Sequence, residues 1–435
     1  MTGGTGSVNS GDSGFFTSRH ATPLAIKCCS TPPPMVRSYM AFFNTEMTLL
    51  ILGVILLATV LAGTLSSRFG FPALVGFIGL GILAGVEGPG GFYFENFELT
   101  QGIGIACLLF ILFSGGMDTD WRDVRRMAAP ALLLATIGVL VSAGIVALSA
   151  IFILGFGPLQ GALLGAVIAS TDAAAVFAVL RSSGLDLHGD VPALIETESG
   201  SNDPMAIFLV GAALFLIESP TASPLQLAPD FAIQMVMGAI VGVGVGFGMP
   251  EILKRGGYQQ GGLAFVISIA AALIAFGLAE VLAGNGFLAS YVAGIVAGNR
   301  TYAAKATVSG FQDGMAWLSQ VVMFFTLGLL VTPSNLGPVI VPGLSITFIL
   351  MFVARPLSVF ICLAPFRQFD WRSKLFVSWA GLRGAVPIVL ATFPMVAGVP
   401  GAFAIFNVVF FVVLLSSVIQ GPTIKWAADR LGVRS

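Results

Sequence analysis

The chain has few charged residues and an unusually small share of polar surface to offer to water. Asp, Glu, Lys and Arg together make up 9% of its 435 residues, whereas hydrophobic residues make up 56%. A chain this apolar cannot cover its surface with polar groups, so we expect it in a lipid bilayer. The net charge of −1 provides no basic surface for nucleic acid.

Histidine and cysteine are also scarce. The two histidines, His20 and His188, fall outside the apolar runs, so neither a buried Ser–His pair nor a bis-histidine haem site can be built from them. The four cysteines show neither metal-ligand nor disulfide spacing. These absences argue against an enzyme, and we expect no cofactor.

The N-terminal residues 1–46 differ from the rest of the chain. They are polar, rich in Pro, Gly and Ser, and show no helical periodicity, which predicts a disordered or non-native extension. They also lack the charged start, apolar core and cleavage site of a signal peptide. We expect the native chain to begin at Met40 or Met47.

The remaining sequence predicts an all-α membrane protein with 13 transmembrane helices within residues 47–421, because each span needs roughly 20 mostly apolar residues. The tail, 422–435, is expected to be cytoplasmic. The predicted spans are 47–66, 71–87, 102–117, 128–154, 161–180, 192–218, 231–253, 261–282, 286–299, 314–331, 337–363, 373–397 and 403–421.

The positive charges support this count. Of the 20 Lys and Arg residues, three lie in the N-terminal extension and two, Arg355 and Arg383, lie within predicted helices. All the others fall in loops on one side of the membrane or in the tail, which the positive-inside rule assigns to the cytoplasm. We therefore predict a multi-pass protein of the bacterial inner membrane, with its N-terminus outside and its C-terminus in the cytoplasm.

Short motifs recur seven helices apart. GILAG at 81–85 in the second helix returns as GIVAG at 294–298 in the ninth, and the polar interruption ASTDAAA in the fifth is matched by GLRGAVP in the twelfth. An odd offset inverts the second copy, which predicts two inverted six-helix repeats (helices 1–6 and 8–13) with broken, crossing helices 5 and 12. The alternative is chance, because short Gly- and Ala-rich matches are common in membrane helices.

Ionisable residues at membrane depth are costly and usually mark a pathway. The candidates are Asp172, Glu198, Asp203 and Arg383, whereas Arg355 could either be buried or reach the membrane interface. Because an arginine keeps its charge, Arg383 needs a permanent anion. We expect Glu198 to pair with Arg383, which leaves Asp203 free.

The sixth helix carries the sequence ETESGSNDP. Helical spacing places Glu198, Ser199, Asn202 and Asp203 on one face, and Pro204 frees the carbonyl of Gly200 beside them. Carboxylate, hydroxyl and carbonyl oxygens are hard ligands that suit an alkali cation. The alternative is a structural polar seam between helices. If Asp203 binds either a proton or one cation, that competition is sufficient for electroneutral exchange.

The fifth helix is interrupted by Ser170, Thr171 and Asp172. Side chains of this kind cap broken helices, so the Thr171 carbonyl could face the ion while Asp172 meets the positive end of a half-helix. A purely architectural role for Asp172 stays open.

These motifs, together with ARPLSVF at 354–360 and WAGLRGAVPI at 379–388, resemble the first family of monovalent cation:proton antiporters, and most of all its NhaP-type potassium/proton members. The resemblance implies a 13-helix homodimer that serves pH homeostasis or cell volume regulation. It implies a proton and cation site at Asp203, with Ser199 and the Thr171 backbone as ligands and Asp172 nearby. It also implies a Glu198–Arg383 pair and a tether through Asn202.

One position departs from the family pattern, because Ser114 stands where an acid is common in the third helix. A weaker field discriminates less against the larger potassium ion, so we expect K⁺/H⁺ exchange. A Na⁺/H⁺ antiporter of the same fold is the nearest alternative. A cation channel is a more distant one, since no filter-like repeat is present.

Overall fold

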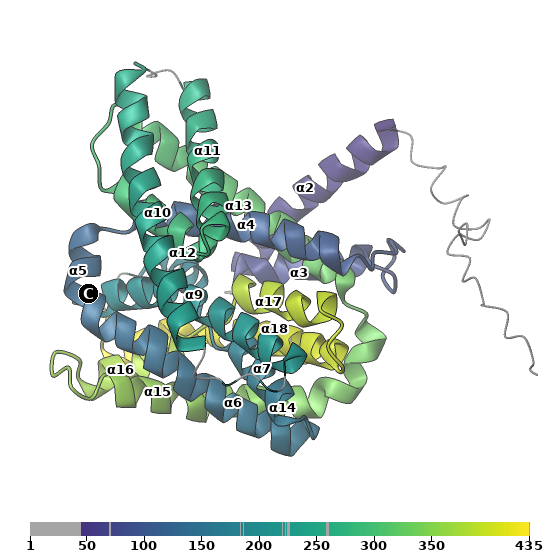
Figure 1. The fold of residues 1–435 in the computed structure, drawn as a ribbon. Helices are drawn as coiled ribbons and strands as arrows, with labels where there is room; N and C mark the ends of the chain where they lie inside the picture. The colour runs from purple at the N-terminus through teal and green to yellow at the C-terminus, as the bar shows by residue number, and fades with distance from the viewer. Residues whose placement is uncertain are drawn as a thin grey trace, which may run out of the picture. The chain divides into compact units, whose positions relative to one another are not determined.

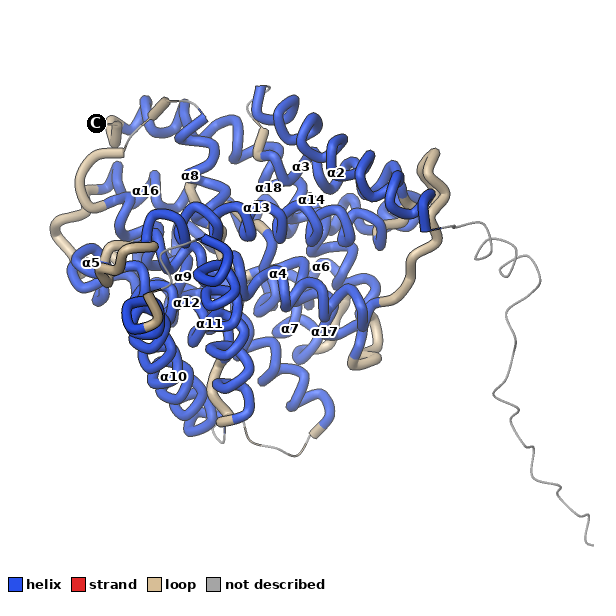
Figure 2. The backbone as a smooth tube through the Cα atoms, turned by 90° about the horizontal axis from the view of Figure 1, so that it is seen from above, coloured by secondary structure: helices blue, strands red, loops and turns tan. Residues whose placement is uncertain are grey.

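A computed structural model describes residues 45–68, 71–182, 184–185, 187–219, 221, 223, 227–257 and 261–434. Most of the predicted N-terminal extension lies outside the described residues. Of the two candidate start residues, Met40 lies outside them and Met47 within them. Within these ranges the chain forms helices and no strand longer than an isolated bridge. Figure 2 shows the helices in one colour, joined by short loops.

The first repeat runs through the helices that precede residue 219. In chain order they are α2 (Thr45–Arg68), α3 (Ala73–Ala84), α4 (Phe97–Asp118), α5 (Trp121–Leu133), α6 (Val139–Leu154), α7 (Pro158–Ile168), α8 (Ala173–Ser182) and α9 (Val191–Glu218). A π-helical turn, Leu134–Gly138, joins α5 to α6 without a loop.

A linking helix, α10, separates the repeats. The second repeat follows it, and α10 and α11 run side by side (Figure 1). The helices are α10 (Leu227–Arg255), α11 (Gly261–Val281), α12 (Gly286–Gly298), α13 (Lys305–Leu330), α14 (Ile340–Ile349), α15 (Arg355–Cys362), α16 (Trp371–Trp379), α17 (Ala385–Val396) and α18 (Ala402–Leu431). A 3₁₀ turn, Pro333–Val339, precedes α14, and a π-helical turn, Leu350–Ala354, joins it to α15.

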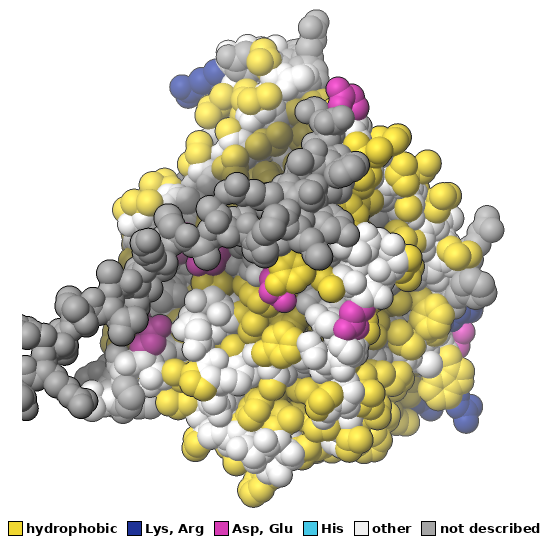
Figure 3. All heavy atoms as spheres, turned by 90° about the vertical axis from the view of Figure 1, so that its right-hand side faces the viewer, with side chains coloured by type: hydrophobic (Ala, Val, Ile, Leu, Met, Phe, Trp, Pro, Cys, Tyr) yellow, Lys and Arg dark blue, Asp and Glu magenta, His cyan; other side chains and the backbone are white. Residues whose placement is uncertain are grey.

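Ten of the described helical segments are long and apolar enough to cross a membrane, and three shorter apolar helices are α3, α12 and α17. The shorter ones coincide with the second, ninth and twelfth predicted spans. The total of thirteen crossings stays a prediction, since length and composition alone do not place a membrane. Figure 3 shows hydrophobic side chains over much of the face that it presents, as a lipid-facing surface requires.

The inverted repeat is visible in the packing. Helix α3 packs on α13, and α4 packs on α12, which are the two contacts that exchange when helices are shifted by seven. Both contacts are made through facing glycines. A methyl group added at Gly81 would lie 2.8 Å from Gly328 Cα, and one added at Gly294 would lie 3.0 Å from Gly116 Cα. Gly81 belongs to the GILAG motif and Gly294 to the GIVAG motif. The two motifs therefore make the same kind of helix contact, one in each repeat.

The π-helical turns repeat in the same way, one in the fourth and one in the eleventh predicted span. Two such turns in matching places agree with the repeat that the motifs predict. The predicted fold class, an all-helical membrane protein with broken fifth and twelfth spans, is confirmed.

The two largest differences from the predicted boundaries are at α13 and α18. Helix α13 begins at Lys305, because the polar stretch 305–313 continues the helix beyond the apolar core that we used to define the tenth span. Helix α18 continues to Leu431, so most of the predicted tail is helical. Hydropathy finds the apolar part of a helix, whereas hydrogen bonding sets its ends.

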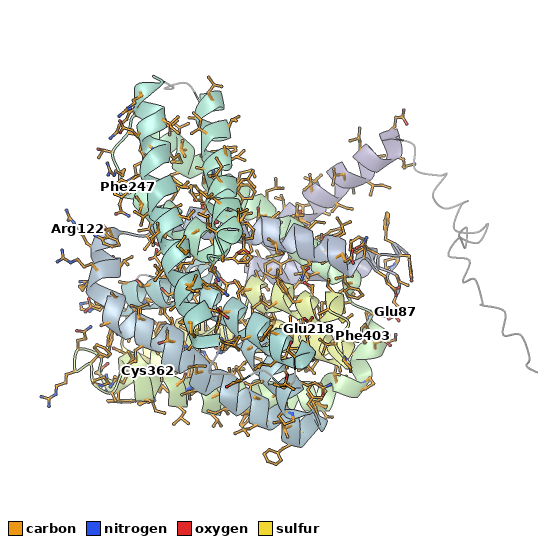
Figure 4. All side chains as sticks on the ribbon, viewed as in Figure 1. Glu87, Arg122, Glu218, Phe247, Cys362 and Phe403 are labelled. Atoms are coloured by element: carbon orange, nitrogen blue, oxygen red, sulfur yellow. The ribbon has the colours of Figure 1, made fainter. Side chains whose placement is uncertain are left out.

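Residues that the prediction placed on opposite sides lie apart. Figure 4 shows Arg122 at one side of the view and Glu87, Glu218 and Phe403 towards the other. This is the separation that alternating loops require.

Candidate functional site

The two broken helices meet at their interruptions. Helix α7 stops at Ile168 and α8 starts at Ala173, while α16 stops at Trp379 and α17 starts at Ala385. The Asp172 amide donates to the Leu382 carbonyl at 2.8 Å, which links the two extended stretches directly.

Asp172 caps the half-helix that follows it. Its Oδ1 accepts from the Ala175 amide at 3.0 Å. The carboxylate also lies against the start of α17, where Gly384 is the N-cap residue. A methyl group at Gly384 would lie only 1.6 Å from Asp172 Oδ2, so a residue with a β-carbon fits there only if the Asp172 side chain moves. The negative charge thus sits beside the positive ends of two helices.

Arg383 has the role opposite to that of Asp172, because it binds the C-terminal end of a helix. Its guanidinium is buried and donates to the carbonyls of Ala169 and Ser170, at 2.7 and 2.5 Å, where α7 ends. These carbonyls lack helical partners and carry the negative end of the helix dipole. Arg383 therefore neutralises a helix C-terminus and is not the partner of Glu198.

The expected Glu198–Arg383 pair is wrong. Glu198 is paired with Arg355, in a two-pronged contact of 2.6 and 2.9 Å, and both side chains are buried. Arg355 follows the π-helical turn Leu350–Ala354 directly. Sequence alone did not decide whether Arg355 is buried or reaches the membrane interface, because it lies near a helix end. Only the packing of α15 decides between the two.

Asn202 and Ser199 fasten α9 to the first break. Asn202 Nδ2 donates to Thr171 Oγ1 at 2.6 Å, and Ser199 Oγ donates to the Thr171 carbonyl at 2.9 Å. Ser199 Oγ also accepts from the Ala173 amide at 3.0 Å. Two of the predicted cation ligands, Ser199 and the Thr171 carbonyl, are therefore bonded to each other in this structure.

Asp203 is buried, and its Oδ1 has no hydrogen-bond partner in the described part of the chain. The hydroxyl of Ser170, which is also buried, has none among the same residues. A buried carboxylate oxygen without a partner is unfavourable, which indicates that a proton, an ion or water binds there. Sequence analysis named Ser170 as part of the break and missed it as a candidate ligand.

A cavity of about 480 Å³ connects these groups. Asp203, Ser170, Thr171, Asp172 and Ser199 all line it, whereas Glu198, Asn202 and Arg383 do not. The cavity also reaches residues that sequence analysis did not single out. These residues are Asp118, Thr119, Arg181, Glu196 and Tyr291.

Ser114 lies away from the cavity lining, and its hydroxyl donates to Asp313 Oδ1 on α13 at 3.0 Å. The argument that Ser114 weakens the field at the ion site is therefore not supported by the geometry. Among the residues the structure describes, no three His, Cys, Asp or Glu side chains gather as they do in a multivalent metal site.

Two inverted helical repeats, with broken helices that cross beside a buried carboxylate, are the architecture of a secondary transporter. The chain belongs to the sodium/hydrogen exchanger family, whose transmembrane-region model matches residues 54–430. Its relatives are ion antiporters, so it is a transporter and not an enzyme.

Individual relatives support this membership. The chain is 42% identical to the K(+)/H(+) antiporter NhaP of Alkalimonas amylolytica, over 88% of this chain and 67% of that one. It is 40% identical to the K(+)/H(+) antiporter NhaP2 of Shewanella oneidensis, over 87% of this chain and 66% of that one. The chain thus spans about two thirds of the length of these relatives.

Two more distant similarities are to proteins named for sodium. The chain is 27% identical to the Na(+)/H(+) antiporter NhaG of Bacillus atrophaeus, over 74% of this chain and 62% of that one. Its fold matches the sodium proton antiporter MjNhaP1 of Methanocaldococcus jannaschii with a TM-score of 0.74, 22% identity, and coverage of 89% of this chain and 99% of that one.

Proposed function

We propose that the chain exchanges one monovalent cation, preferably K⁺, for one proton at Asp203. The observation that carries the proposal is the buried Asp203 Oδ1, which has no partner among the described residues and belongs to a side chain that lines the cavity. Because Glu198 is neutralised by Arg355 and Asp172 caps a helix, Asp203 is the carboxylate left to exchange its proton for a cation.

The cation ligands in this proposal are Asp203, Ser199 and the Thr171 carbonyl, with Asp172 beside them. Since Ser199 and Thr171 are bonded to each other, cation binding exchanges that hydrogen bond for two ion contacts. Asn202, Glu198 and Arg383 hold the surrounding helices. Because one carboxylate binds either one proton or one monovalent cation, the exchange is electroneutral.

Potassium is preferred on the strength of the relatives at 40–42% identity, which are named K⁺/H⁺ antiporters. A Na⁺/H⁺ antiporter is the second candidate, because the more distant relative and the matched structure carry sodium in their names. We also propose a homodimer in the bacterial inner membrane, N-terminus outside and C-terminus cytoplasmic, that serves pH homeostasis or cell volume regulation.

The decisive experiment uses proteoliposomes with a pH-sensitive dye trapped inside. Pulses of K⁺ or Na⁺ should move protons for the wild type and not for Asp203→Asn, and an imposed membrane potential should leave the rate unchanged. Activity retained in Asp203→Asn would remove Asp203 from the mechanism. A larger response to Na⁺ than to K⁺ would select the second candidate.

Competition for one carboxylate also predicts the pH dependence. Protons and cations exclude each other at Asp203, so lowering the pH should raise the apparent KM for K⁺, by about tenfold per pH unit once the protonated form predominates. A KM that does not change with pH would mean that the two ions bind at separate sites.

A further inference from the structure

The cavity contains a second group of oxygen atoms, away from Asp203. Thr119 ends α4, and its Oγ1 lies 2.7 Å from Glu196 Oε1 on α9. Asn299 holds this end of α4, because its Nδ2 donates to the Thr119 carbonyl at 2.8 Å. Glu196 precedes Asp203 by two helical turns, which is roughly 10 Å along the axis of α9. The two carboxylates therefore cannot share one ion.

Tyr291 lies between them. Its side chain is on α12 and is 6% exposed. Its hydroxyl interacts with Thr119 but makes no hydrogen bond of good geometry with any described residue. The ring packs on Gly200, where an added methyl group would lie 2.4 Å from the phenolic oxygen. Gly200 is one turn from Glu196 and one turn from Asp203, on the same face of α9. Tyr291 consequently lies in the wall of the cavity, between the two carboxylates.

A buried hydroxyl without a partner needs a physical explanation. Tyr291 interacts electrostatically with both Glu196 and Asp203, and it lines the cavity with them. Gly200 has no side chain, which allows the ring of Tyr291 to approach α9 closely. An ion or its hydration water bound beside the hydroxyl would supply the missing partner.

The donor set defines the ligand. Glu196 supplies a carboxylate, and Thr119 and Tyr291 supply hydroxyl oxygens, all of which are hard ligands for an alkali cation. Asp118, which is exposed, adds negative charge, whereas Arg181 opposes it. This group offers one carboxylate, which accepts a hydrogen bond from Thr119, two hydroxyls and room for water. It therefore suits a partly hydrated monovalent cation.

We propose that Glu196, Thr119 and Tyr291 form an outer cation site, at which a K⁺ or Na⁺ ion that retains part of its water stops before it reaches Asp203. The inference rests on the proposed antiport at Asp203, and it adds a binding step that exchange at a single carboxylate does not require. The outer ion concentrates the cation next to the exchange carboxylate while its remaining water is removed.

Binding is measured first, in the Asp203→Asn background. A rapid K⁺ or Rb⁺ concentration step on a solid-supported membrane produces a charge displacement whenever the cation binds, even if nothing is transported. We expect Asp203→Asn to give a small saturable signal and the double variant Asp203→Asn/Glu196→Gln to give none. The absence of a saturable signal in Asp203→Asn would overturn the outer site.

Transport by single variants is the second measurement. Glu196→Gln and Tyr291→Phe should raise the apparent KM for K⁺, by about fivefold and about threefold, with kcat at saturating K⁺ little changed. Arg181→Gln should lower KM by about twofold, and an effect of this sign cannot come from misfolding. Wild-type KM in both Glu196→Gln and Tyr291→Phe would contradict the inference.

Two matched controls separate the site from general effects. Tyr302→Phe removes another buried phenolic hydroxyl that has no partner in the described ranges but does not line the cavity. Glu251→Gln removes one negative charge from the exposed face of α10. Both should leave KM and the binding signal unchanged. Transport that persists in Asp203→Asn contradicts the proposed function instead, whatever the outer site does.

Discussion

The two broken helices use opposite charges for the same structural problem. The first break supplies an acid, Asp172, which caps α8 and lies against the start of α17. The second supplies a base, Arg383, which binds the carbonyl end of α7. Each break is therefore completed by a side chain from the other one.

The helices that follow the breaks differ more. Helix α9 brings Asp203 into a cavity with an oxygen that has no partner among the described residues. In the corresponding helix, α18, Ser416 accepts from the Arg383 amide at 3.1 Å and Gln420 donates to the Trp379 carbonyl at 2.9 Å. Ser416 and Gln420 of α18 therefore bind the backbone of the second break. One half of the repeat thus holds the proposed substrate site, and the other braces it.

The matching π-helical turns show the same division. The turn Leu134–Gly138 is followed by apolar Val139, whereas Leu350–Ala354 is followed by Arg355. The π-helical turn is therefore followed by a charged residue in only one of the two repeats.

The largest effect is expected from breaking the Glu198–Arg355 pair. Arg355→Met should lower the free energy of unfolding by about 3–5 kcal/mol, because it leaves a buried carboxylate without its counter-charge. Thermal unfolding in detergent measures this change. The double variant Glu198→Gln/Arg355→Met should recover much of the loss. A second double-mutant cycle measures the coupling energy between Glu198 and Arg383. If it equals that between Glu198 and Arg355, the pairing is contradicted.

The second effect concerns the crossing. Gly384→Ala should reduce exchange by more than about tenfold, because its methyl group would displace the Asp172 carboxylate from its position beside two helix starts. Proteoliposome exchange measures it. The control is Gly144→Ala on α6, where an added methyl group meets nothing within 4 Å. Wild-type exchange in Gly384→Ala would mean that the two breaks do not depend on each other.

The third effect decides between the two roles of Asp172 that sequence left open. Asp172→Asn keeps a side chain that can cap α8, so stability should fall by less than about 1 kcal/mol. Loss of the charge beside the ion should raise the apparent KM for K⁺ by about tenfold. An unchanged KM would make Asp172 purely architectural, and Asp172→Ala, which also removes the cap, would then lose stability alone.

The smallest effect sharpens the contrast between the halves. Ser170→Ala should raise the apparent KM for K⁺ by about threefold, because this hydroxyl lines the cavity without a partner among the described residues. Ser417→Ala on α18 removes a hydroxyl that is equally buried and equally unpartnered within the described ranges, away from the cavity. It should change nothing. Equal effects of both substitutions would remove Ser170 from the ion site.

Sequence predicted the all-helical fold and both broken helices because hydropathy and the motifs ASTDAAA and GLRGAVP are local signals. It also proposed Asp203 as the exchange carboxylate, which stays a prediction. It could not predict that Glu198 pairs with Arg355, since that choice depends on how α15 packs against α9. Ser170 and Tyr291 escaped notice for a similar reason. A hydroxyl without a partner can be recognised only when all of its neighbours are known.

The contact between Asp172 and Gly384 has a consequence for how such a sequence can change over generations. The Asp172 carboxylate occupies the space that a β-carbon at position 384 would need, so two residues far apart in the chain compete for one small volume. A larger residue at 384 becomes acceptable only after the side chain at 172 has shrunk, and the capped helix starts are lost with it. Substitutions at one of the two positions therefore constrain those at the other.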